Sequence, residues 1–136
     1  MISALFVALS LQYGLPSGLL SSLCYVESKY KVEAVHHDDG GEDSIGICQI
    51  KYSTAKALGF KSTRTALFDP KTNIKYAAIY LKHQISRYNS IQRGVIAYNR
   101  GNARSIRTSK YQQKVFRRWD EYKSRRSCSL HRCNRD

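Results

Sequence analysis

Apolar residues recur at helical spacing along most of the chain, and this periodicity limits the possible folds more than any other feature. Proline occurs only twice among the 136 residues, at Pro16 and Pro70, where each is suited to the first turn of a helix. We therefore predict one mainly helical domain. The clearest apolar stripe lies in segment 70–88 and contains Ile74, Ala77, Ala78, Leu81, Ile85 and Tyr88.

Asp69 is the predicted N-cap of segment 70–88, and Ser90 is that of the helix that follows it. Glycines and polar capping residues divide the rest of the chain into further predicted helices, at about 2–13, 16–30, 53–59, 90–101 and 109–124. The polar, glycine-containing segment 36–43 predicts a loop, and the short apolar run 44–50 permits a strand. The predicted fold is thus mainly α with a small β element near residues 36–52. Residues 1–124 form the predicted domain, and residues 125–136 a basic, mobile tail.

Residues 1–15 share the apolar character of a targeting segment but lack its other marks. No basic residue precedes the apolar run, no small-residue cleavage site follows it, and the run is too short to span a bilayer. Ile2, Leu5, Phe6, Leu9 and Tyr13 follow helical spacing instead. We interpret the segment as a packed first helix without a clear signal peptide, and a role in export or membrane binding is the alternative.

Glu27 occupies the apolar face of the second predicted helix. Leu20, Leu23 and Cys24 precede it by seven, four and three residues, which is the spacing of one helical face. A carboxyl in such a place loses solvation, its pKa rises, and it can then donate a proton near neutral pH. Cleavage of a glycosidic bond needs a donor of this kind. The alternative is a glutamate at the rim of the helix that reaches water.

The charge of the chain implies a polyanionic partner. The formal net charge is +13 and the pI is about 9.8, which suits nucleic acid, a bacterial envelope or an anionic membrane. Basic residues are interleaved with aromatic ones in the C-terminal third, so a nucleic-acid-binding helical module is the rival class of function. The basic residues are Arg100, Arg104, Arg107, Lys110, Lys114, Arg117, Arg118, Lys123, Arg125, Arg126, Arg132 and Arg135.

The four cysteines fall into two groups. Cys24 and Cys48 lie within apolar segments, so we predict buried free thiols. Cys128 and Cys133 lie in the polar tail and could form a disulfide in an oxidising compartment. His131 lies between them, but a convincing fourth ligand is missing, and we predict no metal site.

Four short motifs follow one another in the order of a known family. The chain contains Glu27-Ser28, then Gly46-Ile47-Cys48-Gln49, then Asp69-Pro70-x-x-Asn73-Ile74, then Ala97-Tyr98-Asn99-Arg100-Gly101. Each motif is weak alone, but the ordered set resembles the soluble lytic transglycosylase family, whose catalytic domain has the lysozyme-like fold. The resemblance covers roughly residues 15–105. It departs from the family pattern where Ile47 and Cys48 replace leucine and methionine, and where Val32 replaces a frequent proline.

This resemblance implies roles for five residues. Glu27 would be the single catalytic acid and base, and Ser28 would help to hold that acid and the sugar. Gln49 would contact the bound glycan, Tyr98 would point at the catalytic carboxyl, and Asn99 would support the same wall. The implied reaction cleaves the bond between N-acetylmuramic acid and N-acetylglucosamine in peptidoglycan and leaves 1,6-anhydro ends, without a cofactor. From the residues alone, Gln49 could instead satisfy backbone groups, and Tyr98 could be a core residue.

The acidic segment that precedes Gly46 leaves a second reaction open. Asp38, Asp39, Glu42 and Asp43 lie in a loop that is longer than in many lytic transglycosylases and resembles goose-type lysozymes in length. A second carboxylate across the cleft could activate water, and the enzyme would then be a hydrolase. Asp39 is the residue of this loop that we predict at the substrate. The alternative is a solvated acidic loop, and the spacing does not match an EF-hand.

The expected partners are peptidoglycan glycan strands, with the basic C-terminal region attracted to the anionic envelope and no nucleic acid involved. We expect a monomer that acts in the bacterial periplasm or cell wall. A small, basic lytic enzyme of this kind suggests a bacteriophage source, either in the virion or released at lysis as an endolysin.

Overall fold

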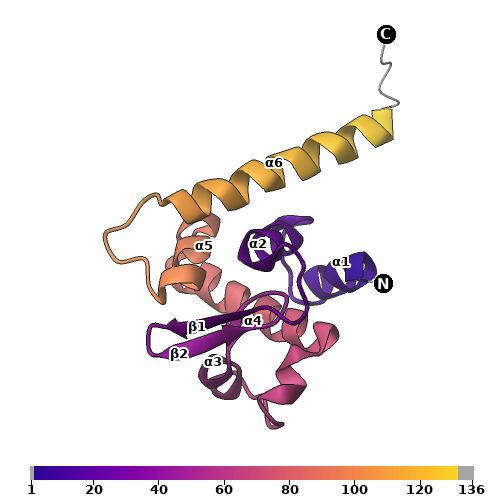
Figure 1. Ribbon diagram of the computed structural model, residues 1–136. Coiled ribbons are helices and arrows are strands. Elements are labelled where there is room, and N and C mark those ends of the chain that lie inside the picture. The colour runs from indigo at the N-terminus through magenta and orange to yellow at the C-terminus, as the bar shows by residue number, and fades with distance from the viewer. Residues whose placement is uncertain (1, 132–136) are drawn as a thin grey trace.

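The computed structural model describes residues 2–131 and has the predicted mainly helical fold with one small sheet (Figure 1). In chain order the elements are α1 (Ile2–Gln12), α2 (Leu19–Ser28), β1 (Val35–Asp39), β2 (Glu42–Ile45), β3 (Ile50–Lys51), α3 (Tyr52–Ala57), a 3₁₀ helix (Thr65–Phe68), α4 (Pro70–Tyr88), α5 (Ile91–Arg100) and α6 (Lys110–His131).

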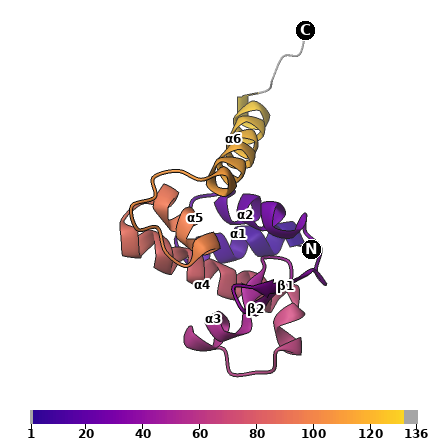
Figure 2. The same cartoon turned by 60° about the vertical axis from the view of Figure 1, so that its left-hand side comes forward.

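Helix α4 is the central element of the fold. It packs against α1, α5 and the 3₁₀ helix, while α6 lies across α2 and α5 (Figures 1 and 2). The sheet and α3 lie together on the side of the molecule opposite α6. The core between these elements contains the fully buried side chains Leu19, Leu20, Leu23, Ile45, Ile47, Ile50, Leu67, Ile74, Leu81, Val95 and Val115. The predicted stripe of α4 and the packed first helix are thus confirmed.

The caps predicted for α4 and α5 are present. The Asp69 carboxylate accepts a hydrogen bond of 3.0 Å from the Thr72 backbone N–H, directly before Pro70 at the first helical position. Ser90 Oγ accepts one of 3.1 Å from the Arg93 backbone N–H, and α5 ends at Gly101 in the left-handed conformation. These local signals lie within a few residues of each helix end, so the sequence could reveal them.

Two predicted helix boundaries were wrong. The second helix begins at Leu19 instead of Pro16, because Gly18 has a φ of +85° and interrupts the helical path. The last helix continues to His131 instead of ending near Ser124. Arginine has a high helix propensity. In addition, Arg125 forms an ion pair with Glu121 at 4.0 Å, and Arg126 donates a hydrogen bond of 2.8 Å to Ser17 Oγ. The predicted division at residue 124 remains a prediction, and residues 132–136 lie outside the described part of the chain.

The acidic segment 36–43, predicted as a loop, forms most of a β-hairpin. Strands β1 and β2 pair antiparallel, with Val35 opposite Ile45 and Asp39 opposite Glu42, and β3 adds to the far edge of β2. Gly40 and Gly41 form the turn with φ values of +68° and +93°, which glycine adopts without strain. The predicted β element near residues 36–52 is therefore confirmed, with more strand than the composition indicated.

Cys24 and Cys48 form a disulfide, so the prediction of two free thiols was wrong. Both side chains are fully buried, as their apolar surroundings indicated, but only the fold places them side by side. The disulfide joins α2 to the turn at residues 46–49, on the side where Glu27 lies. The possible pair of Cys128 and Cys133 involves Cys133, which lies outside the described residues.

Replacing both Cys24 and Cys48 by alanine is expected to lower the free energy of unfolding by about 3 kcal/mol, because the cross-link closes a loop with a sequence separation of 24 residues. Urea denaturation of the variant and the wild type, both without reductant, measures this difference. An unchanged midpoint for the double variant would contradict the prediction.

None of the helices in the described part of the chain combines the length and apolar character required to cross a bilayer.

Candidate active site

Glu27 lies in the last turn of α2 with its carboxyl largely surrounded by protein. The Tyr111 hydroxyl of α6 donates a hydrogen bond of 2.7 Å to Glu27 Oε2. Burial raises the pKa of Glu27 from 4.5 to about 7, while the Tyr111 hydrogen bond lowers it and the charge of Asp39 raises it further. A carboxyl with this pKa can both give and take a proton near neutral pH.

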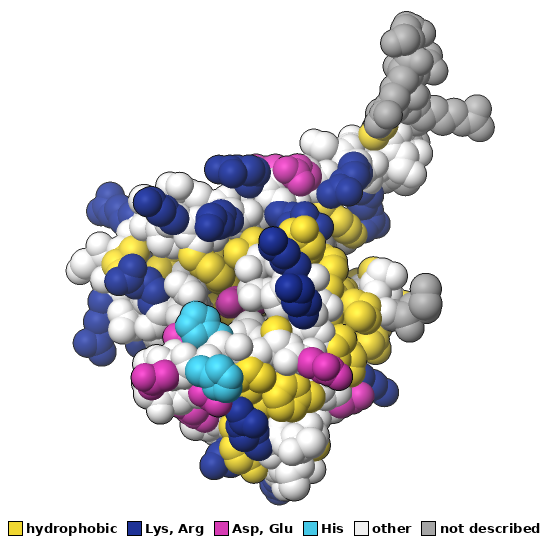
Figure 3. All heavy atoms as spheres, in the orientation of Figure 1, with side chains coloured by type: hydrophobic (Ala, Val, Ile, Leu, Met, Phe, Trp, Pro, Cys, Tyr) yellow, Lys and Arg dark blue, Asp and Glu magenta, His cyan; other side chains and the backbone are white. Residues whose placement is uncertain are grey.

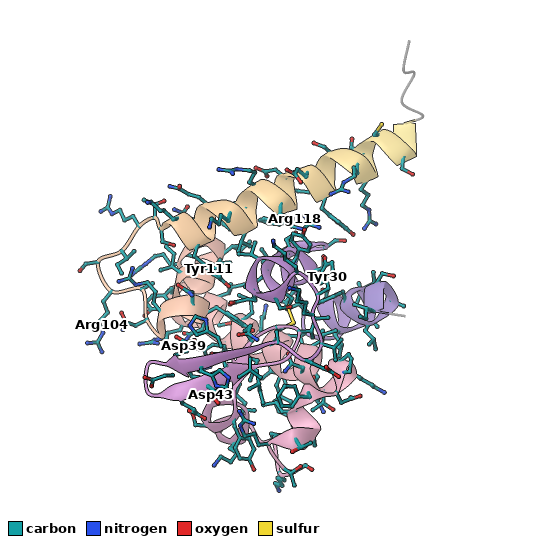
Figure 4. The ribbon with its side chains drawn as sticks, viewed as in Figure 1. Tyr30, Asp39, Asp43, Arg104, Tyr111 and Arg118 are labelled. Atoms are coloured by element: carbon teal, nitrogen blue, oxygen red, sulfur yellow. A yellow bond between two sulfur atoms is a disulfide. The ribbon has the colours of Figure 1, made fainter. Side chains whose placement is uncertain are left out.

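The Glu27 carboxyl opens into a cleft of about 460 Å³ between the β-hairpin and the C-terminal end of α5. In Figure 4, Tyr111 extends from α6 on one side of this region and Asp39 from β1 on the other. Most lining residues are polar or aromatic, which suits a hydroxylated ligand such as a sugar. The lining consists of Glu27, Asp39, Gly40, Ser44, Gln49, Ile50, Lys51, Thr54, Tyr80, Tyr98, Asn99, Arg100 and Gly101.

Ser28 connects the end of α2 to the turn at residues 46–49. Its hydroxyl donates a hydrogen bond of 2.6 Å to the Ile47 carbonyl and accepts one of 3.1 Å from the Lys31 backbone N–H. The side chain is buried and is not part of the cleft lining described above. Ser28 therefore connects the end of α2, next to Glu27, to this turn, and the sugar contact implied by the family resemblance stays a prediction.

Asn73 of α4 holds the same turn from the other side. It is fully buried and accepts a hydrogen bond of 2.8 Å from the Cys48 backbone N–H. Its amide nitrogen donates to the carbonyls of Ile45 at 3.0 Å and Leu67 at 2.8 Å. Gly46 has a φ of +83° and lies so close that a Cβ would be 2.2 Å from Asn73 Nδ2. The turn that forms one wall of the cleft is therefore fixed by α4.

Gln49 lies in the cleft lining, but its amide nitrogen already makes hydrogen bonds to the backbone. Nε2 donates to the carbonyls of Ala34 at 3.1 Å and Gly46 at 3.0 Å. The amide nitrogen of Gln49 therefore satisfies backbone carbonyl groups, which is the alternative that the sequence left open. Since an amide has a separate oxygen acceptor, a ligand contact by this side chain would use Oε1.

Tyr98 also lines the cleft, but its hydroxyl donates 2.7 Å to the Cys48 carbonyl instead of to Glu27. The hydroxyl that is hydrogen-bonded to Glu27 is that of Tyr111. Burial, followed by the proximity of Glu27, raises the pKa of both tyrosines, so both remain protonated donors at neutral pH. In the sequence, Tyr111 is only one of the apolar and aromatic residues at helical spacing in the last helix, with Val115 and Trp119. Its hydroxyl was the one indication of a further role, because a buried tyrosine hydroxyl usually has a hydrogen-bond partner.

Asp39 is the acidic residue of the hairpin that faces the cleft, and it accepts a hydrogen bond of 2.6 Å from Ser44 Oγ. Glu42 instead accepts from the Ser53 backbone N–H at 2.9 Å, and Asp43 pairs with Arg64 at 3.0 Å. Asn99 is exposed at the end of α5 on the opposite side of the cleft. Of the acidic residues left open by the sequence, Asp39 is thus the one with access to a ligand beside Glu27.

Among the side chains that the structure describes, within residues 2–129, no group of three or more histidine, cysteine, aspartate or glutamate residues is arranged to hold a metal ion. The cleft itself contributes two carboxylates and no histidine or cysteine.

Comparison with known proteins gives the following matches. The family model described as Transglycosylase SLT domain matches residues 4–119. The protein named Transglycosylase from Enterobacteria phage PRD1 is 28% identical over 113 residues, which are 81% of this chain and 40% of that protein. Protein IpgF from Shigella flexneri is 29% identical over 113 residues, which are 79% of this chain and 74% of that protein.

Among solved structures, an inactive mutant of lytic transglycosylase Slt from Pseudomonas aeruginosa matches with a TM-score of 0.69 and 23% identity, over 82% of this chain and 22% of that one. This match confirms the expected lysozyme-like fold. The chain spans less than half the length of the phage relative and about a fifth of the Slt chain.

Proposed function

The chain belongs to the transglycosylase SLT domain family, and on that premise we propose that it is a peptidoglycan lytic transglycosylase with Glu27 as its single acid and base. The observation that carries this proposal is the position of Glu27, whose desolvated carboxyl, with a pKa of about 7, opens into a polar cleft. The rival interpretation, a nucleic-acid-binding helical module, would explain neither that carboxyl nor that cleft.

In the first step, protonated Glu27 gives its proton to the glycosidic oxygen as the bond from C1 of the muramyl sugar to that oxygen breaks. The N-acetyl group of the same sugar assists at C1 from the opposite face, as in other substrate-assisted glycosidases. Tyr111 fixes the carboxyl with a hydrogen bond of 2.7 Å. That bond favours the carboxylate formed when the proton leaves.

In the second step, the Glu27 carboxylate takes the proton from the C6 hydroxyl of the muramyl sugar. O6 forms a bond to C1 from one face as the N-acetyl oxygen that assisted in the first step leaves C1 on the other. This closes a 1,6-anhydro ring and returns Glu27 to its protonated form, so the balanced reaction consumes no water. The order of events requires a group that is an acid first and a base second at the same pH, which supports a role for a carboxyl with a pKa of about 7.

Hydrolysis is the second candidate, and the observation that favours it is Asp39. This carboxylate lines the same cleft and acts electrostatically on Glu27. Activation of a water by Asp39 would give a hydrated reducing end instead of an anhydro ring. Asp39 is already hydrogen-bonded to Ser44, which supports a role in shaping the cleft over one as a base.

Mass spectrometry of the fragments released from purified peptidoglycan tests the proposal. Wild type is expected to release products one water lighter than hydrolytic fragments, with 1,6-anhydro ends. Hydrated reducing ends that disappear in an Asp39→Asn variant would instead establish the hydrolase. Release of no fragments by a folded wild type would contradict both.

Replacing Tyr111 by Phe is expected to lower turnover about tenfold and to move the alkaline limit of activity to higher pH. Glu27 loses the hydrogen bond that lowers its pKa, so it stays protonated over a wider range while its orientation is less well fixed. Tyr98→Phe is the matched control. The Tyr98 hydroxyl donates to the Cys48 carbonyl, so its removal should not move the alkaline limit of activity. The pH dependence of turnover on soluble glycan strands measures both, and identical profiles would contradict the assignment.

As a cell-wall enzyme, the protein would act on glycan strands in the bacterial envelope, which fits the phage and bacterial relatives. Lysine and arginine side chains cover much of α6 and the loop before it (Figure 3), and Arg104 points outward from that loop in Figure 4. Attraction of this surface to an anionic envelope, a monomeric state and a role in entry or lysis remain predictions.

A further inference from the structure

A second and larger hollow lies away from the active-site cleft. It is a groove of about 950 Å³ between α1, α6 and the first turn of α2, and it shares no lining residue with the cleft. Its volume is at the upper end of the range of about 300–1,000 Å³ that is typical of ligand pockets. The groove is therefore a separate feature that the proposed wall-cleaving reaction does not use.

The apolar side of the groove is formed mainly by α1. Phe6 and Leu15 are almost fully buried at its base, whereas Val7 is 55% exposed and Leu11 is 78% exposed. These two are the large apolar side chains that remain exposed in the described part of the chain. Figure 3 shows apolar side chains gathered between α6 and α1 on the right of the molecule. Apolar surface concentrated in this way typically marks an interaction site.

The other side of the groove carries three arginines of α6. Arg118 stacks on the Tyr25 ring at 3.2 Å from its centroid, and Arg126 donates to Ser17 Oγ at 2.8 Å. Both partners are neutral, so these contacts orient the guanidinium groups without cancelling their charge. Arg125 is paired with Glu121 at 4.0 Å, and within residues 2–129 the structure gives Arg118 and Arg126 no carboxylate partner. Tyr30, which is below Arg118 in the view of Figure 4, also lines the groove.

We propose that this groove binds an anionic membrane lipid, with an acyl chain along α1 and the anionic headgroup at Arg118, Arg125 and Arg126. The argument is complementarity, because the groove pairs one apolar side with one cationic side, as an anionic lipid does. A purely polyanionic ligand would leave Val7 and Leu11 in water. The binding is interfacial, like that of an amphipathic surface helix. The proposal goes beyond the wall-cleaving function and does not depend on it.

Vesicle binding by the whole protein tests the proposal. The probes are phosphatidylcholine vesicles and vesicles in which about a third of the lipid is phosphatidylglycerol, compared by co-sedimentation. We expect the wild type to bind the anionic vesicles and to bind neutral ones at least tenfold more weakly. The double variant Val7→Gln/Leu11→Gln should lose about tenfold in affinity for the anionic vesicles, although it keeps every charge.

The contribution of charge at the groove is separated from that of net charge by a matched pair of variants. Arg125→Gln removes one charge at the groove and should lower affinity several-fold. Arg104→Gln removes one charge from the loop between α5 and α6, outside the groove lining, and should have a smaller effect. Equal losses for the two variants would mean that only the overall charge attracts the vesicle, and would overturn the proposal.

Trp119 provides a readout of acyl-chain position, because it is the only tryptophan and its Nε1 donates 2.9 Å to the Ser17 carbonyl beside the groove. Phosphatidylglycerol brominated on its acyl chain should quench Trp119 emission in the wild type and much less in Val7→Gln/Leu11→Gln. Absence of quenching would overturn the proposal. It would also be overturned if the wild type bound no vesicles and instead formed a dimer in solution that Leu11→Gln abolished, because the groove would then be an interface between two copies of the protein. Val7 and Leu11 lie outside the cleft, so cleavage of peptidoglycan should be unchanged in these variants, and loss of cleavage activity would be a separate result.

Discussion

Replacing Glu27 by Gln is expected to lower turnover of peptidoglycan by about 10³-fold and, at the same time, to make the folded protein more stable above neutral pH. Turnover falls because glutamine keeps the shape of the side chain and can still accept the Tyr111 hydrogen bond, but has no proton to donate. Stability rises because the variant no longer places a negative charge in a desolvated site.

The direction of the pH effect follows from the pKa of Glu27 in the two states. The pKa is 4.5 in the unfolded chain and about 7 in the folded one, so the folded state binds more protons between these values. This contribution to stability is fully present below pH 4.5 and is lost as the pH rises through about 7. The loss in wild type is on the order of 3 kcal/mol, and Glu27→Gln should not show it.

Urea denaturation of both proteins at pH 5 and pH 8 measures this difference, and fragment release from peptidoglycan measures turnover. Glu33→Gln is the matched control, since Glu33 is exposed six residues further along the chain and should change neither quantity. A Glu27→Gln variant that retained activity would contradict the catalytic assignment. An unchanged stability difference between the two pH values would contradict the desolvation of the carboxyl.

Replacing Gly46 by Ala is expected to destabilise the fold by about 4 kcal/mol or more. The added Cβ would lie 2.2 Å from Asn73 Nδ2 and 2.7 Å from Asn73 Cγ, so this buried amide would have to move. Its movement would weaken hydrogen bonds to Cys48, Ile45 and Leu67, at about 1–3 kcal/mol for each buried group left without a partner. The positive φ of Gly46 adds about 1–2 kcal/mol for a residue with a Cβ.

Gly41→Ala separates the two causes. Gly41 has a similar φ of +93°, but a Cβ there would meet nothing within 4 Å, so its cost should be limited to the backbone term of about 1–2 kcal/mol. Thermal denaturation followed by circular dichroism compares both variants with wild type. Equal losses for the two glycines would show that the contact with Asn73 is not the cause.

The helices and their caps could be read from the sequence because each depends on residues a few positions apart. The stripe of α4 and the capping residues Asp69 and Ser90 were predicted and are present. The two wrong helix ends have different causes. Gly18 interrupts a helix that Pro16 could have started, and the end of α6 is supported by a contact between Arg126 and Ser17, 109 residues apart in sequence.

The candidate site was predicted in part for the same reason. Apolar spacing within one helix was enough to single out Glu27, and the ordered motifs placed Gln49, Tyr98 and Asn99 near it. Tyr98 was expected to point at the Glu27 carboxyl, but the Tyr111 hydroxyl makes the hydrogen bond to it. Sequence spacing did not indicate this partner, because it is 84 residues away and its position depends on how α6 crosses α2. The Cys24–Cys48 disulfide was missed because apolar surroundings indicate burial but not which buried groups are neighbours.

Short-range periodicity and residue type were therefore enough to identify the class of fold, the family motifs and a carboxyl on an apolar helix face. The tertiary structure decided which tyrosine holds that carboxyl, which acid of the hairpin faces it, and that α1 and α6 enclose a groove with one apolar and one cationic side. These features depend on distances between segments that are far apart in the chain, and local spacing carries no information about such distances.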